Sequence, residues 1–258
     1  GAGNDVAAVD AFGTMTYTTG VVNQARPYNP IVLGRFASGD PKTVIGIGDS
    51  ILDGVGDTLS GYSVRGFGQA LFDADHVSNP IGGANFGLSG GTSAYWAGAG
   101  SDRLTSYLKY AKYALDENET NRINGNTQLA TAQSETLALW SACASNGINS
   151  ILRTKLIPRT SGSDGTLPNT AYSSGGAGRL FNDWLDTPGL GTAEGVTLTL
   201  LPVNSLRIGT DQATDDFYRW AGATSGNLGP NNGDGTHPNA AGSVLMAGDY
   251  RAGIATLP

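Results

Sequence analysis

The chain has 258 residues, a length that fits one large domain or two small ones. Its seven Phe, ten Tyr and four Trp are typical of a folded chain and argue against disorder. The net charge is −7, and the 15 Lys and Arg form no cluster, so we expect no nucleic-acid partner.

The first 42 residues differ in pattern from the rest of the chain. A Thr-rich segment with β character covers 13–20, two prolines follow within 23–30, and 38–41 predicts a turn. We therefore expect residues 1–42 to form an extension with one or two edge strands. Residues 43–258 are expected to form the main domain.

Predicted strands and helices alternate through the main domain. The predicted strands cover 43–47, a segment ending near 85–88, then 108–115, 148–157 and 196–203. The predicted helices cover 62–74, 127–146, 178–186 and 239–254. This alternation predicts a parallel sheet with helices on both faces, which is a three-layer α/β/α sandwich. The turn-rich stretches 160–176 and 222–235 are long enough to suggest functional loops.

A serine lies where the first of these strands ends. The segment 46–53 reads Gly-Ile-Gly-Asp-Ser-Ile-Leu-Asp, with Ser50 directly after the apolar strand. Functional groups in α/β folds lie at this edge of the sheet. If a helical turn follows, its free N–H groups would stabilise an oxyanion that forms beside Ser50.

Two further segments complement this serine. The segment 234–239 reads Asp-Gly-Thr-His-Pro-Asn, so Asp234 can bond to the His237 ring and fix its tautomer. The other ring nitrogen can then take the proton of a serine hydroxyl. The segment 85–92 reads Asn-Phe-Gly-Leu-Ser-Gly-Gly-Thr and can place a backbone N–H near a substrate carbonyl.

In this order, the three segments resemble the SGNH hydrolases, the GDSL-type esterases and lipases, over roughly 42–252. The resemblance implies a flavodoxin-like fold with a central parallel sheet. It also implies Ser50 as nucleophile, His237 as base and Asp234 as orienting acid. The N–H groups of Ser50 and Gly90 would be oxyanion donors. Ile51 stands where the family usually has Leu.

The family's third block, Gly-x-Asn-Asp, is altered in this chain. Its best match is Asp-Glu-Asn-Glu at 116–119, which implies the Asn118 side chain as a third oxyanion donor. In a second register Asp116 takes the place of this asparagine, and an ionised carboxylate cannot donate a hydrogen bond. Three nearby residues are possible substitutes: Asn121, Asn124 and Asn126.

Competing readings of these motifs are weaker. Ser89 fits the Gly-x-Ser-x-Gly elbow of α/β hydrolases, but an acid three residues before the histidine favours Ser50. A dinucleotide fingerprint fails because its third glycine position is Ile51. The aspartates at 49, 53 and 57 lack calcium-loop spacing. We therefore expect no cofactor and no metal.

Several single residues have structural and functional readings. We expect His76 to have a structural or surface role, and the single cysteine, Cys143, to be buried. Trp140 and Trp184 fit helix cores. Two tryptophans in turn-rich regions are candidates for stacking on sugar rings: Trp96 and Trp220.

The sequence thus predicts a serine esterase acting on a small-molecule or polysaccharide ester. Polar loops near His237, without an apolar lid helix, favour short acyl groups, and we favour acetyl groups on a carbohydrate. Lipase, thioesterase and arylesterase activities on the same site stay open, as does a non-catalytic carbohydrate-binding module. No apolar run is long enough for a membrane span. The Asp-rich, Lys-poor composition fits a soluble secreted or periplasmic protein.

Overall fold

The computed structural model describes residues 6–9, 15–17, 42–56, 81–124, 128–161, 164–224, 229–230 and 234–258. These belong to two compact units, Gly1–Ser38 and Gly39–Pro258. In the first unit, β1 (Val6–Val9) and β2 (Met15–Tyr17) pair with each other as a two-stranded antiparallel sheet. The predicted helix over 62–74, His76, Asp57 and Asn126 lie outside the described residues.

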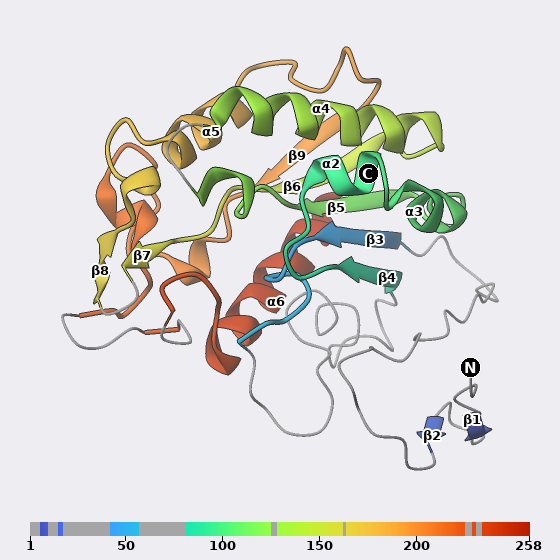
Figure 1. The fold of residues 1–258 in the computed structure, drawn as a ribbon, viewed down its shortest axis with the longest axis horizontal. Helices are drawn as coiled ribbons and strands as arrows, with labels where there is room; N and C mark the ends of the chain where they lie inside the picture. Colours follow the sequence, from blue (N-terminus) through green and yellow to red (C-terminus); the bar gives the residue numbers. More distant parts are fainter. Residues whose placement is uncertain are drawn as a thin grey trace. The chain divides into compact units, whose positions relative to one another are not determined.

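A five-stranded parallel sheet forms the centre of the second unit (Figure 1). Its strands, in spatial order, are β4 (Ile81–Gly87), β3 (Lys42–Gly48), β5 (Tyr113–Glu117), β6 (Ser150–Thr154) and β9 (Thr197–Leu201). Val44 and Ile47 of β3 are fully buried, as expected for a central strand covered on both faces. Gly48 is level with Gly87 and Glu117, so the loops after these three strands start at one edge.

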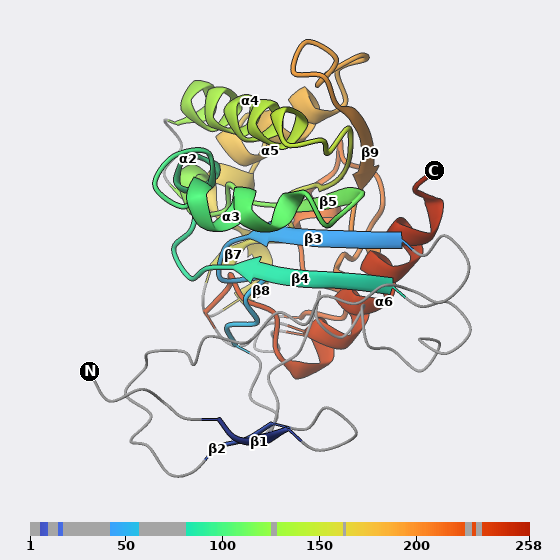
Figure 2. The same ribbon diagram turned by 90° about the vertical axis from the view of Figure 1, so that its right-hand side faces the viewer.

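Helices cover both faces of this sheet and confirm the predicted three-layer sandwich. One face carries α2 (Ser93–Ala97), α3 (Ser101–Leu108), α4 (Leu129–Ser145) and α5 (Ala177–Leu185) (Figures 1 and 2). The other face carries α6 (Ala240–Thr256), which packs Met246, Tyr250 and Ile254 into the core. Within the described part of the chain, no helix is long and apolar enough to cross a bilayer.

The strand predicted over 108–115 begins later than expected. Leu108 ends α3, and the strand itself starts at Tyr113. The helices α2 and α3 were not predicted, because five and eight residues are too few to show a clear helical period. The expected loop 160–176 contains a small hairpin, β7 (Thr160–Ser161) with β8 (Asp164–Pro168).

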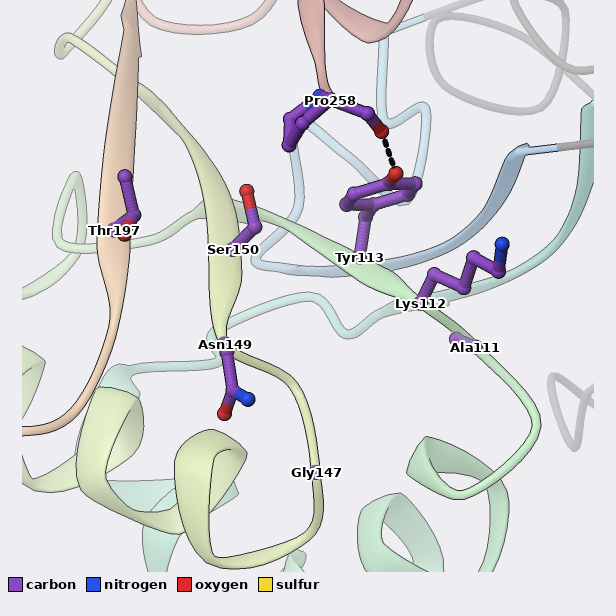
Figure 3. A pocket seen from close by; sticks show the side chains of 8 residues that line it. All are labelled: Ala111, Lys112, Tyr113, Gly147, Asn149, Ser150, Thr197 and Pro258. Carbon is purple, nitrogen blue, oxygen red and sulfur yellow. Dashed lines mark hydrogen bonds between the residues drawn. The ribbon is translucent and has the colours of Figure 1, made fainter.

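A pocket lies at the amino ends of β5, β6 and β9 (Figure 3). It is lined by Ala111, Lys112, Tyr113, Gly147, Asn149, Ser150, Thr197 and Pro258. The Tyr113 hydroxyl donates a hydrogen bond to the Pro258 carbonyl at its rim. Because Tyr113 is the first residue of β5, this pocket is at the opposite edge of the sheet from Gly48.

Candidate active site

Ser50 lies in a tight turn that directly follows β3. The Asp53 N–H donates to the Asp49 carbonyl at 3.0 Å, and the Val55 N–H donates to the Ser50 carbonyl at 2.9 Å. Only glycine fits at position 48, directly before the turn. A Cβ there would lie 2.5 Å from the Leu52 Cβ and 2.7 Å from the Glu117 carbonyl oxygen. The close packing of strand, turn and neighbouring strand therefore fixes where Ser50 is presented.

His237 reaches Ser50 from the loop that precedes α6. Its Nε2 lies 2.7 Å from the Ser50 Oγ, and its Nδ1 lies 2.5 Å from Asp234 Oδ2. Asp234 Oδ1 accepts the N–H groups of Thr236 and His237 at 2.7 and 2.8 Å. Partial burial raises the pKa of Asp234, but the bonds from His237 and Thr236 outweigh it and leave this pKa below its ordinary value. Asp234 is thus held as a carboxylate beside the ring.

Local backbone geometry explains the sequence of this loop. Gly235 has a φ of 78°, a left-handed conformation that favours glycine, and lets Asp234 fold back onto the ring. The Gly235 carbonyl accepts the Thr160 N–H at 2.9 Å, which ties the loop to β7. Asn239 caps α6 by accepting the Gly242 N–H at 3.0 Å. The loop is therefore anchored on both sides of His237.

Gly90 lies in the loop between β4 and α2. The Leu88 N–H and the Trp96 ring N–H both donate to the Gly48 carbonyl, at 3.1 and 3.2 Å. These bonds hold the loop against the end of β3. Gly90 is exposed with a φ of 80°. Within the described residues, neither its N–H nor the Ser50 N–H donates to an acceptor. Both are therefore available to a ligand oxygen.

Asn118 is turned into the core and does not join this group. Its Nδ2 donates to the Ile47 carbonyl at 3.2 Å and to Asp116 Oδ1 at 2.8 Å, so both amide hydrogens are used. Asn121 is exposed, and its Nδ2 donates to the Gly91 carbonyl at 3.1 Å. That bond uses one of its two amide hydrogens. Asn121, one of the three substitutes named from the sequence, is therefore hydrogen-bonded to the loop that carries Gly90.

The end of β5 carries a cluster of buried acidic side chains. Asp116, Glu117 and Glu119 are buried, together with Asp49 from the serine turn. Glu119 has a φ of 85°, and its Oε1 accepts the Ser93 N–H at 3.1 Å. Burial raises the pKa of Glu119 to about 7. The signal available in the sequence was the run of acidic residues directly after an apolar strand.

The structure also decides among the other candidate residues. His237 bonds to Ser50, whereas Ser89 is exposed on the loop after β4. Trp96 and Trp220 are 1% and 0% exposed, so the prediction that they stack on sugar rings is wrong. Trp96 instead packs on Phe86, with the rings 6.2 Å apart. Among the described residues, no group of His, Cys, Asp and Glu side chains is arranged to hold a metal ion.

Helix packing accounts for the remaining tryptophans and for the cysteine. Trp140 of α4 stacks on Trp184 of α5, with ring centroids 6.0 Å apart, as the helix-core reading expected. Cys143 is buried on the same face of α4 as Trp140, and burial raises the pKa of its thiol. Neither feature belongs to the site.

No family model matches the sequence, and no curated protein matches it. Solved structures do match. One match is the psychrotrophic esterase EstA from Pseudoalteromonas, in a structure of the enzyme inhibited by monoethylphosphonate. It is 14% identical with a TM-score of 0.56, over 83% of this chain and 97% of that one. A protein from Desulfitobacterium hafniense assigned to the lipolytic G-D-S-L family is 15% identical with a TM-score of 0.57, over 82% and 99%. TesA is 16% identical with a TM-score of 0.55, over 83% and 98%. The chain therefore has the α/β fold of GDSL-type esterases and lipases, as the motif resemblance implied.

Proposed function

We propose that this protein hydrolyses carboxylic esters through Ser50, His237 and Asp234. The observation that carries the proposal is the unbroken chain of hydrogen bonds from Asp234 Oδ2 through the ring to the Ser50 Oγ, at 2.5 and 2.7 Å. An ionised Asp234 accepts the Nδ1 hydrogen, which leaves the Nε2 lone pair facing the hydroxyl. This is the tautomer in which His237 can act as a base.

The reaction follows from this arrangement. Ser50 Oγ attacks the ester carbonyl while His237 Nε2 removes its proton, and the carbonyl π electrons move onto the oxygen. The tetrahedral intermediate collapses when His237 returns that proton to the leaving alcohol, and an acyl group stays on Ser50. Water then attacks the acyl group with His237 again acting as base, which releases the acid and restores the hydroxyl.

We assign the oxyanion donors to the N–H groups of Ser50 and Gly90 and to the Asn121 side chain. The first two lack acceptors among the described residues, and Asn121 is bonded to the carbonyl of Gly91, the residue after Gly90. Asn118 is left out because both of its amide hydrogens serve the core. Donors that are positioned before the reaction stabilise the charge that develops in the transition state.

For the substrate we propose a short acyl group, with acetyl esters of a carbohydrate as first choice. The loop tips next to the serine carry small or polar exposed residues, namely Ser89, Gly90 and Asn121. Such tips give little apolar surface for a long acyl chain. Lipase, thioesterase and arylesterase activities would use the same residues and differ only in the acyl or leaving group.

A chain-length series of p-nitrophenyl esters, together with acetate release from acetylated polysaccharides, tests this proposal. We expect acetyl esters to have the highest kcat/KM and the Ser50→Ala variant to be inactive on all of them. If kcat/KM is instead highest for esters of long acyl chains, the protein is a lipase and not an acetylesterase. If the wild-type protein turns over no ester but binds the polysaccharides, the chain is a binding module that retains the fold.

A further inference from the structure

Two buried carboxyl groups lie on the serine turn and on the strand next to it. Asp49 precedes Ser50 in the turn, and Glu117 is the last residue of β5, level with Gly48. The Asp49 N–H donates to the Glu117 carbonyl at 3.2 Å. The two side chains are 0% and 2% exposed, and each has one buried oxygen without a hydrogen-bond partner among the described residues, Asp49 Oδ2 and Glu117 Oε2. The backbone bond from Asp49 to Glu117 ties the serine turn to the neighbouring strand.

A hydrogen bond between these two carboxyl groups would require a proton. An ionised carboxylate only accepts hydrogen bonds, so two carboxylates in contact cannot bond to each other. Asp49 Oδ1 already accepts the Ile51 N–H at 2.9 Å. Asp49 Oδ2 and Glu117 Oε2 receive no N–H or O–H from another described residue. One shared proton satisfies both oxygens and removes the repulsion between two buried charges.

A buried cation, Arg153, forms its hydrogen bonds and its ion pair with groups other than this pair. Arg153 of β6 donates to the Asp116 and Asn118 carbonyls at 2.8 and 3.0 Å, and its Nε lies 3.6 Å from Asp116 Oδ2. Asp116 also accepts the ring N–H of Trp140 at 2.8 Å. Arg153 lowers the pKa of both Asp49 and Glu117, but burial raises each pKa by more.

Every element around the pair contributes a titratable or charged group. These groups are Arg153 of β6, Asp116 of β5, Tyr172 of the short helix Thr170–Tyr172, Tyr250 of α6 and His237. Burial raises the pKa of Asp49 to about 6, with the Ile51 N–H and His237 holding it down. Burial and the Asp49 charge raise the pKa of Glu117 well above its ordinary value. Because Asp49 accepts the Ile51 N–H, which favours its ionised form, we assign the proton to Glu117.

We propose that Glu117 is a positioning residue, which stays protonated at neutral pH and donates a hydrogen bond to Asp49 to hold the turn that presents Ser50. The proposal rests on the proposed function of Ser50 as nucleophile. When Glu117 loses its proton, two adjacent buried carboxylates repel each other. The turn then relaxes, and the Ser50 Oγ leaves its position beside His237. Ester hydrolysis must therefore fall on the alkaline side.

The test compares kcat as a function of pH for wild type, Glu117→Gln and Glu117→Ala on p-nitrophenyl acetate, with Glu194→Gln as a distant control. Wild type and Glu194→Gln are expected to lose activity at alkaline pH. Glu117→Gln should keep its neutral-pH kcat and lack the alkaline fall, because a carboxamide N–H donates to Asp49 at every pH. Glu117→Ala should lower kcat by about 10–100-fold with KM little changed, as misplacement of a nucleophile does.

A second measurement does not depend on activity. Infrared spectroscopy at neutral pH is done on proteins that also carry Glu119→Gln, because Glu119 holds a second buried proton. A buried protonated carboxyl band should be present when Glu117 is unchanged and absent from the protein with Glu117→Gln. The proposal is overturned if this band is the same in both proteins, or if the alkaline fall is absent from wild type or persists unchanged in Glu117→Gln. If wild type turns over no ester, the function of Ser50 fails, and the infrared comparison alone decides whether Glu117 holds the proton. If Glu117→Ala does not fold, the Gln variant carries both readouts.

Discussion

The ends of β3 and β5 lie side by side in the sheet but use their polar residues in opposite ways. After β3 the chain turns at once, and Ser50 meets the ring of His237. After β5 the chain stays buried through residue 120, so Asn118 and Glu119 bond to core groups instead. The first exposed polar side chain beyond β5 is that of Asn121. The point at which the chain leaves the core, more than the residue type, decides which side chain can reach a ligand.

The largest expected effect comes from removing the hydroxyl at the end of β3. Ser50→Ala should reduce kcat by about 10⁴-fold or more without lowering the melting temperature, because among the described residues the hydroxyl is hydrogen-bonded only to His237. Steady-state hydrolysis of p-nitrophenyl acetate measures it. Ser89→Ala on the neighbouring loop is the matched control and should stay near wild type. The reverse pattern would move the nucleophile to the Ser89 loop.

The carboxylate beside His237 should matter nearly as much. Asp234→Asn cannot accept the Nδ1 hydrogen in the same way, and the ring loses the tautomer that presents Nε2 to Ser50. We expect kcat to fall by about 10³–10⁴-fold. Asp211→Asn, on an exposed loop, serves as the control. An Asp234→Asn variant with near-normal kcat would show that another group orients the ring.

The next prediction sharpens the comparison of the two asparagines after β5. Asn121→Ala should lower kcat by about 10²–10³-fold with little change in KM, as for the loss of an oxyanion donor. Asn118→Ala should instead reduce the free energy of unfolding by about 1–3 kcal/mol, because Asp116 loses a buried donor. Kinetics and chemical denaturation of both variants measure this. If Asn118→Ala alone reduces kcat and leaves stability intact, the assignment must be reversed.

These two strand ends also show what can be predicted from the sequence. Ser50, Asp234 and His237 could be placed because the first follows an apolar strand and the other two are three residues apart around Gly235. Buried parallel strands are apolar runs, so the start of β3 was predicted within one residue. Asn118 was chosen by its likeness to a motif. Its burial depends on Arg153, which comes from β6 and donates to the Asn118 carbonyl. Long-range packing of this kind leaves no local signal.

The smallest expected effect on activity concerns Glu119. Its pKa is raised from 4.5 to about 7, so the folded chain binds this proton more tightly than the unfolded chain does. The proton on Glu119 therefore adds to the free energy of unfolding. This contribution is complete below pH 4.5 and is lost as pH rises to about 7, a change of about 3 kcal/mol. Glu119→Gln should flatten this part of the unfolding free energy and leave kcat nearly unchanged, because Oε1 can still accept the Ser93 N–H. Urea denaturation from pH 4 to 8 measures the slope. An unchanged slope would contradict a buried proton on Glu119.

The most direct test of the account is covalent labelling of the intact protein with an alkyl fluorophosphonate, followed by mass spectrometry of its peptides. The geometry at the end of β3 predicts one adduct per chain, on Ser50, formed rapidly in wild type and very slowly in His237→Ala. An adduct on Ser89, or no adduct at all on a folded wild-type chain, would contradict the proposed role of Ser50.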